Sequence, residues 1–399
     1  MAQLFPFAFF VVGDGEEPLL RIVRHVENGN DASRLVSLTR SDPNIHHPLH
    51  GKEKNVVPSK TDINSLQQPR RSNIGILTAM SAQIQIEGSR GCSWNKCSFC
   101  SIPGTMPDGW APIDEESIIQ QIVEISQSGA GYPHFTDSDF FGNDPMRATR
   151  LALRISEEKR LGRINPEMEF YFNLLTTSIL GGFNVRKEDC AVALMAWKDA
   201  GLTEVFIGIE SGSKKQIQRY QKASTRIKNL AAIQMARQLG LSLDIGFIMF
   251  DHASSLEELS ENLNFIHSAN LDYHPSRLTH PMRLQMGTDV VASFDGQLGD
   301  LDIDSLSFSY AFQDPTIAKI VAMLIDVNHH FSCWTEQQQA VFHSSDANNT
   351  EKFEAKYRLG KFRKIELSFL KSLAESPATV YCPHAETNLV EQLEQVTLP

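Results

Sequence analysis

The stretch that decides the fold of this 399-residue chain reads Ser89-Arg90-Gly91-Cys92-Ser93-Trp94-Asn95-Lys96-Cys97-Ser98-Phe99-Cys100. It places three of the six cysteines within nine residues. Three thiolates on one loop can bind three corners of a [4Fe–4S] cubane and leave the fourth iron free for a chelating molecule. The ring of Phe99 would shield such a cluster from water. A structural zinc site is the alternative, but zinc normally takes four ligands, so His134, His252 or a distant cysteine would have to be the fourth.

Strand-like and helix-like segments alternate from residue 82 to residue 290. Amphipathic stretches predict helices that begin at Asp114, near Asp189 and near Thr225. Strands are expected at 82–87, 132–136, 168–174, 205–209 and 243–250, with a sixth within 273–284. This alternation predicts an α/β fold, a partial (β/α)6 barrel of parallel strands with helices outside. Chemistry in such folds collects at the carboxyl ends of the strands, where the cysteines are therefore expected.

The cysteine run resembles the radical S-adenosylmethionine (SAM) superfamily, whose usual spacing is C-x3-C-x2-C with an aromatic residue before the last cysteine. Here the spacing is C-x4-C-x2-C, one residue longer between Cys92 and Cys97. The resemblance implies that Cys92, Cys97 and Cys100 hold a [4Fe–4S] cluster whose open iron binds SAM. It also implies an electron donor such as a flavodoxin or ferredoxin.

Segments at the ends of the later strands lie where this superfamily contacts SAM. An Asp137 or Asp139 carboxylate would suit the methionine ammonium group, although an acidic run can equally be a solvated loop. Glu210 and Ser211 would contact the ribose and carboxylate, and Ile248 would pack on the adenine or simply fill the core. The full set of cofactor contacts that the resemblance implies is Phe99, Asp137, Asp139, Asn173, Glu210, Ser211 and Ile248.

The N-terminal segment predicts a strand, a turn and a helix. Its turn, Val11-Val12-Gly13-Asp14-Gly15-Glu16, resembles the end of the cobalamin-binding domain that precedes the barrel in one branch of the superfamily. Residues 1–40 are accordingly interpreted as a truncated, cobalamin-domain-like remnant. No histidine fits the Asp-x-His-x-x-Gly spacing of a cobalt ligand, so this chain is not expected to hold cobalamin alone. The remnant would either cap the barrel or dock a cobalamin-domain partner protein.

The remaining boundaries follow from composition. Residues 41–81 are polar and proline-bearing and are predicted to be a linker, 82–290 the barrel, and 291–399 a mostly helical C-terminal region. In that region Asp314-Pro315 predicts a helix start, residues 344–356 are polar, and a last helix is expected over 361–373. The C-terminal region is expected to close the barrel mouth and to determine substrate choice.

Composition restricts the environment and the partners. The chain has 37 basic and 48 acidic residues, a net charge of −11, which disfavours nucleic acid as a partner while allowing a small local basic patch. It has no run of 18 apolar residues, so no membrane partner is expected. Clustered thiols without a disulfide-like pattern are typical of a cytoplasmic protein.

Together these features predict a radical SAM enzyme. By the resemblance, SAM is cleaved reductively to a 5′-deoxyadenosyl radical, which abstracts a hydrogen atom from a small-molecule or peptide substrate, as in natural-product tailoring. One alternative is the radical subunit of a cobalamin-dependent methyltransferase that needs a partner. A second is a non-catalytic iron–sulfur or zinc protein.

Overall fold

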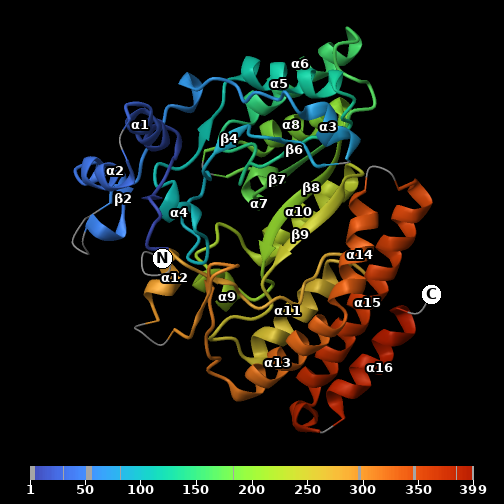
Figure 1. Ribbon diagram of the computed structural model, residues 1–399. Coiled ribbons are helices and arrows are strands. Elements are labelled where there is room, and N and C mark those ends of the chain that lie inside the picture. The colour runs from blue at the N-terminus through green and yellow to red at the C-terminus, as the bar shows by residue number, and fades with distance from the viewer. Residues whose placement is uncertain are drawn as a thin grey trace.

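A parallel five-stranded sheet forms the centre of the protein (Figure 1). The computed structural model describes residues 5–29, 31–50, 56–80, 82–182, 184–294, 298–344, 347–382 and 384–397. Sheet order follows chain order, as expected for repeated strand–helix units. The strands are β3 (Gln85–Ile86), β6 (His134–Phe135), β7 (Phe170–Leu174), β8 (Leu202–Glu210) and β9 (Ser242–Phe247). The predicted α/β fold of partial-barrel type is confirmed.

Helices follow the strands and pack outside the sheet. Asp114 caps the first of them through its side chain, and Gly201, with φ of 112°, ends another at the expected position. The helices are α5 (Glu115–Gln127), α6 (Pro145–Arg160), α7 (Thr176–Leu180), α8 (Lys187–Ala200), α9 (Lys214–Arg219), α10 (Arg226–Gln238) and α11 (Leu256–Ser268).

The sixth strand expected within 273–284 is replaced by an irregular segment. Pro281 makes a single parallel bridge to Phe250, next to β9. Pro275 and Pro281 lack backbone N–H groups, which explains why a continuous ladder does not form there. The chain then enters a small antiparallel sheet in order β10-β12-β11. Along the chain, the short helix α12 (Asp289–Ala292) lies between β10 and β11. These strands are β10 (Leu284–Gln285), β11 (Leu301–Asp302) and β12 (Ser307–Phe308).

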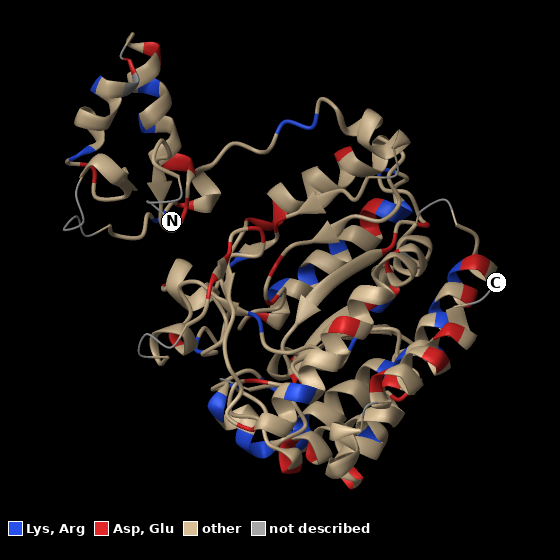
Figure 2. Ribbon diagram, turned by 60° about the horizontal axis from the view of Figure 1, so that its bottom comes forward, with Lys and Arg blue, Asp and Glu red and all other residues tan. Residues whose placement is uncertain are grey.

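The N-terminal residues form a small module to one side of the barrel (Figure 2). The expected strand and helix are present, and the strand pairs antiparallel with a second strand at Ile45–His46. Its elements are β1 (Phe10–Val11), α1 (Glu16–Glu27), α2 (Ala32–Thr39), β2 (Ile45–His46) and the 3-10 turn Pro48–His50. The rest of the segment predicted as linker carries a second 3-10 turn, Ile63–Ser65, and the short helix α3 (Ile74–Ala79).

The C-terminal region is helical and covers one flank of the barrel (Figure 1). Its elements are α13 (Pro315–His330), α14 (Ser332–His343), α15 (Asn349–Glu375), the 3-10 turn Pro377–Tyr381 and α16 (Ala385–Thr397). Asp314 caps α13 as predicted. The helix expected over 361–373 begins twelve residues earlier, because Asn348 and Glu351 form a capping box. Among the described residues, no helix combines the length and apolar character needed to cross a membrane.

Candidate active site

Three free cysteines lie on one loop between β4 (Ser89–Arg90) and α4 (Ile102–Thr105). The loop follows β3, which places it at the carboxyl edge of the sheet. Cys97 is buried, Cys92 and Cys100 are half-buried, and the Cys100 N–H donates to the Cys97 carbonyl at 3.2 Å. Burial raises the pKa of all three thiols, that of Cys97 to about 12, while the nearby Lys222 ammonium acts in the opposite direction.

The one-residue-longer spacing is accommodated by a left-handed turn. Asn95 has φ of 50°, a conformation that asparagine tolerates better than most residues. Its side-chain amide donates to the carbonyls of Met106 and Pro107 at 3.0 and 3.3 Å. The indole of Trp94 donates to the Gln221 carbonyl at 2.7 Å. The loop is therefore tied at its middle to two separate parts of the barrel.

The side chains of Asp137 and Asp139 point into the protein. Asp137 accepts hydrogen bonds from the Gly88 N–H at 2.9 Å and from the Ser89 hydroxyl. Asp139 accepts from the hydroxyls of Ser93 and Ser178. All four carboxylate oxygens thus have protein donors, and Asp139 holds the residue next to Cys92. Burial raises the pKa of both carboxyl groups, that of Asp137 to about 7, against the lowering effect of these hydrogen bonds.

Asn173 and Ser211 are also used within the protein. The Asn173 amide donates to the Asp137 carbonyl at 2.6 Å, which joins β7 to the loop after β6. The hydroxyl of Ser211 is fully buried and lies 2.6 Å from Gln216 Oε1 and 2.9 Å from Asn262 Oδ1. These two predicted contacts therefore support the shape of the strand ends.

Glu210 ends β8 in an unusual conformation. Its φ is 63°, and it sits at a bulge in the pairing of β8 with β9. Its carboxylate forms an ion pair of 3.1 Å with Lys222, whose side chain is only 6% exposed. A non-glycine residue held at positive φ at the end of a central strand is typical of functional sites.

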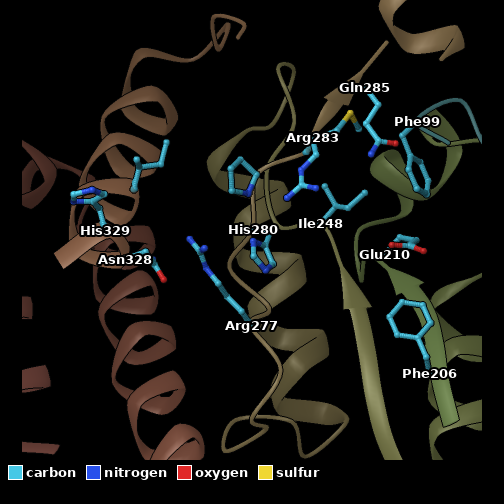
Figure 3. Close-up of a pocket in the computed structure, with 13 residues that line it drawn as sticks. Phe99, Phe206, Glu210, Ile248, Arg277, His280, Arg283, Gln285, Asn328 and His329 are labelled. Atoms are coloured by element: carbon cyan, nitrogen blue, oxygen red, sulfur yellow. The ribbon is translucent and has the colours of Figure 1, made fainter. Parts of the chain in front are cut away.

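A cavity of about 820 Å³ opens beside Glu210 (Figure 3). Its walls come from the cysteine loop, from β8, from the segments after β9 and from α13. This volume is within the range of small-molecule sites. The lining residues are Phe99, Phe206, Glu210, Ile248, Arg277, His280, Pro281, Met282, Arg283, Gln285, Ile325, Asn328 and His329.

Comparison with known proteins assigns this arrangement to a family. Residues 86–266 match the Radical SAM superfamily. This range holds the cysteine loop and all five strands of the sheet, apart from the first residue of β3. The chain contains a radical SAM domain. The predicted resemblance is confirmed, and with it the family's use of a [4Fe–4S] cluster and SAM.

Individual relatives of the radical SAM domain are cobalamin-dependent or act in biosynthesis. The 4′-phospho-dehydrooxetanocin synthase of Priestia megaterium is 31% identical over 207 residues, 50% of this chain and 27% of that protein. The cobalamin-dependent SAM radical enzyme OxsB, with aqua-cobalamin bound, matches 99% of this chain and 64% of its own with a TM-score of 0.74 and 19% identity. TsrM of Kitasatospora setae, a radical SAM methyltransferase, matches 72% of this chain and 55% of its own with a TM-score of 0.55 and 17% identity.

These matches show the fold, and the chain spans only part of each relative. It covers about a quarter of the synthase and under two thirds of OxsB. OxsB matches the C-terminal helices as well as the barrel, since 99% of this chain is covered. The whole chain therefore shares the fold of the matching part of OxsB, whereas activity and substrate are matters for proposal.

The chemistry of the three thiols fits the cluster of a radical SAM domain. They are free, they come from one loop, and Cys92 and Cys100 raise the pKa of the Cys97 thiol through space. In the described ranges, no three side chains of His, Cys, Asp or Glu converge on a point where they could hold a single metal ion. A cubane makes a different demand, because each thiolate binds its own iron. Three thiols on one loop are the donor set that such a cubane takes.

The cavity gathers some predicted residues and several that the sequence did not reveal. Of the residues predicted to contact SAM, three line it: Phe99, Glu210 and Ile248. Asp137, Asp139, Asn173 and Ser211 do not line it and are bound to protein groups instead. The lining residues outside the predicted set are Phe206, Arg277, His280, Pro281, Met282, Arg283, Gln285 and the three residues of α13.

Proposed function

We propose that this chain is a radical SAM enzyme in which Cys92, Cys97 and Cys100 hold the [4Fe–4S] cluster and the adjoining cavity holds SAM and substrate. The observation that carries this proposal is continuity between the two sites. Phe99, which lies between the last two cysteines, is also part of the cavity wall. Whatever binds at the open corner of the cluster therefore faces an open cavity large enough for a second small molecule.

When bound, the cluster and SAM would supply the radical chemistry: reductive cleavage of SAM to a 5′-deoxyadenosyl radical, which would take a hydrogen atom from a small-molecule or peptide substrate. The chain supplies binding, orientation and exclusion of water. Phe206 and Ile248 offer apolar surface on which a purine can pack, and Glu210 offers a carboxylate held in place by Lys222. Asp139 holds Ser93 and so orients the loop of Cys92, rather than binding the cofactor.

The C-terminal helices enclose the cavity from the side away from the cysteines. Ile325, Asn328 and His329 of α13 form that wall (Figure 3). Asn328 is itself fixed by a hydrogen bond of 3.2 Å to Glu366 of α15. We infer that this wall keeps solvent from the radical and contributes to substrate choice, in line with the expectation for the C-terminal region.

The test is production of 5′-deoxyadenosine. The protein is reconstituted anaerobically with iron and sulfide, reduced in the presence of SAM and assayed by chromatography. Wild type should form 5′-deoxyadenosine and Cys97→Ala should not. Cys382→Ala is the matched control, because Cys382 is exposed and lies in the C-terminal region.

Two outcomes would contradict the proposal. One is a wild-type protein that binds a full cluster and SAM yet forms no 5′-deoxyadenosine even when cobalamin is present. The other is equal product from wild type and Cys97→Ala. Either result would indicate that the cysteine loop is a non-catalytic iron–sulfur or zinc site.

A second candidate is the radical subunit of a cobalamin-dependent methyltransferase, and the N-terminal module favours it. Along α1, apolar side chains face solvent, with Leu19 59% and Val26 54% exposed. The same module is anchored beside the cysteine loop, because Asp14 and Glu16 form ion pairs with Arg90 at 3.1 and 2.6 Å. A partner protein bound on α1 would thus be linked to the cluster site.

Cobalamin retention distinguishes the two candidates. The reconstituted protein is mixed with hydroxocobalamin, passed through a gel-filtration column and examined for cobalamin absorbance. The partner-dependent candidate predicts that the chain alone retains none and that methyl transfer appears only with a cobalamin-binding protein added. Cobalamin held by the chain alone would overturn the need for a partner.

A further inference from the structure

The cavity has a cationic wall formed by the irregular segment that replaces the sixth strand. Arg277, His280 and Arg283 recur at every third residue and all line the cavity. Figure 3 shows them between the α13 wall and the wall that contains Phe99 and Glu210. Backbone hydrogen bonds fix the segment against the end of β9, from Met249 N to His280 O at 2.8 Å and from Met282 N to Phe250 O at 2.6 Å. The cationic groups are therefore presented from a rigid backbone.

Neither guanidinium forms a direct ion pair within the described part of the chain, although Glu366 acts on Arg277 and Asp302 interacts with Arg283 through space. Among the described residues, Arg219 and Arg363 hold carboxylates in ion pairs, whereas Arg277 and Arg283 form none. The Nε–H of Arg277 is buried without a hydrogen-bond partner in that part of the chain. A buried donor of this kind costs free energy unless a ligand completes it.

The surroundings add to the positive charge. Glu366, the buried carboxylate behind this wall, already accepts hydrogen bonds from Arg363 at 2.8 Å and Asn328 at 3.2 Å. Burial, together with the charges of Arg277, Arg363 and Arg283, lowers the pKa of His280 to about 3. His280 is thus a neutral imidazole that can accept or donate a hydrogen bond while two unpaired guanidiniums face the cavity. In a chain with a net charge of −11, this is a local reversal of sign.

We propose that Arg277 and Arg283 bind the phosphate group of a phosphorylated small-molecule substrate, with His280 as a further hydrogen-bonding group. This assignment names the substrate class of the proposed radical SAM site and rests on that function. Two unpaired guanidiniums match the two negative charges of a phosphate monoester, whereas one would suffice for a carboxylate. The site lies in the same cavity as Phe99, so a phosphate held there would position the rest of the substrate beside the cofactor end.

Binding of phenyl phosphate to the reconstituted holoprotein tests this assignment, measured by isothermal titration calorimetry at low salt. Benzoate and phenol are the matched carboxylate and neutral probes. Phenyl phosphate should bind at least about tenfold more tightly than benzoate, and Arg277→Gln and Arg283→Gln should each weaken it about tenfold or more, the loss expected for one charge-assisted hydrogen bond. Arg277→Lys should have an intermediate effect, because the charge remains while the planar fork is lost.

Controls separate a specific site from general charge. Arg160→Gln removes an exposed guanidinium on α6 and should leave phenyl phosphate binding unchanged. Arg283 is exposed on the cavity wall, so Arg283→Gln remains informative even if Arg277→Gln fails to fold. Saturating SAM should not displace phenyl phosphate.

Three results would overturn the phosphate site. They are benzoate binding as tightly as phenyl phosphate, unaltered binding in both Arg277→Gln and Arg283→Gln, and displacement by SAM, which would assign the arginines to the SAM carboxylate. The proposed radical function fails independently of the phosphate site: in that case the wild-type protein binds phenyl phosphate but forms no 5′-deoxyadenosine.

Discussion

Lys222 Nζ lies 3.1 Å from Glu210 Oε1, and both side chains are almost completely buried at the end of β8. The ammonium group also interacts through space with Cys97 and Cys92. Burial disfavours the charge on Lys222, but the carboxylate and the thiols together raise its pKa above the ordinary lysine value. The buried Lys222 ammonium therefore interacts both with Glu210, a predicted SAM contact, and with the cysteine loop.

Removal of Lys222 alone should destabilise the protein strongly. Lys222→Met leaves Glu210 as an uncompensated buried charge, so the free energy of unfolding should fall by about 3–5 kcal/mol. The double variant Lys222→Met/Glu210→Gln removes both charges and should lose less. Urea unfolding of the metal-free protein, followed by circular dichroism, measures these differences. Lys215→Met is the control, since its pair with Glu257 is exposed and should contribute at most about 1 kcal/mol; an equal loss in the two lysine variants would contradict the importance of the buried pair.

Substitution of Gly91 should disrupt the cysteine loop. Its φ is 78°, and a Cβ at this position would lie 1.9 Å from the backbone oxygen of Gly109. Because backbone cannot move aside cheaply, Gly91→Ala should reduce the iron and sulfide content per chain after reconstitution and lower the Tm. Gly131→Ala is the matched control, because a Cβ there meets no atom within 4 Å. Full cluster content in Gly91→Ala would show that the loop can assemble around iron in another conformation.

Local sequence signals predicted the cysteine loop and the strands, whereas the substrate end of the cavity depends on contacts distant in sequence. The cysteines are close together along the chain. The periodicity of apolar residues and the amino-acid composition are enough to place β7, β8 and their helices. Arg277 meets α13 only after the chain has passed through the β10–β12 sheet, so no spacing rule could pair them. Two signals were present and overlooked: the prolines that interrupt the sixth strand, and the Asn348-x-x-Glu351 capping box that begins α15.

The carboxylates of the acidic run after β6 are hydrogen-bonded within the protein. Carboxylates suit an ammonium ligand, but burial gives Asp137 and Asp139 another role that composition alone does not reveal. Asp137 accepts a hydrogen bond from Ser89 of β4, and Asp139 accepts from Ser93 of the cysteine loop and from Ser178 of α7. Charge predicted from sequence is a guide to ligand chemistry only where the side chain reaches the cavity.

Loss of Asp139 should therefore act through the position of Cys92. Asp139→Ala leaves the hydroxyls of Ser93 and Ser178 without their acceptor, at a cost of about 1–3 kcal/mol for buried polar groups. We expect a lower iron content and altered cluster absorbance, with partial recovery in Asp139→Asn, which retains one acceptor oxygen. Asp108→Ala is the control, because Asp108 is 65% exposed. If Asp139→Ala instead binds a normal cluster but binds SAM weakly, the original expectation of an ammonium contact would be restored.

His274 should make stability depend on pH in a defined direction. Burial, together with the charges of Lys356 and Arg237, lowers its pKa from 6.5 to about 3. Its Nδ1 accepts a hydrogen bond from the Ser276 N–H at 3.2 Å. Between these two pKa values the unfolded chain binds a proton that the folded chain does not, so the folded state loses stability as pH falls from 6.5. The loss from this one group should reach roughly 2 kcal/mol at about pH 5.

The comparison that isolates this effect is His274→Asn against wild type, by urea unfolding at about pH 7 and about pH 5. Asp137, whose pKa is raised to about 7, acts with the opposite sign but is common to both proteins and cancels. His274→Asn should therefore show a shallower decline in unfolding free energy between the two pH values, while His384→Asn, at an exposed position, should decline like wild type. Parallel declines in wild type and His274→Asn would mean that His274 can be protonated in the folded protein. The segment between α11 and the cationic wall would then have to open readily.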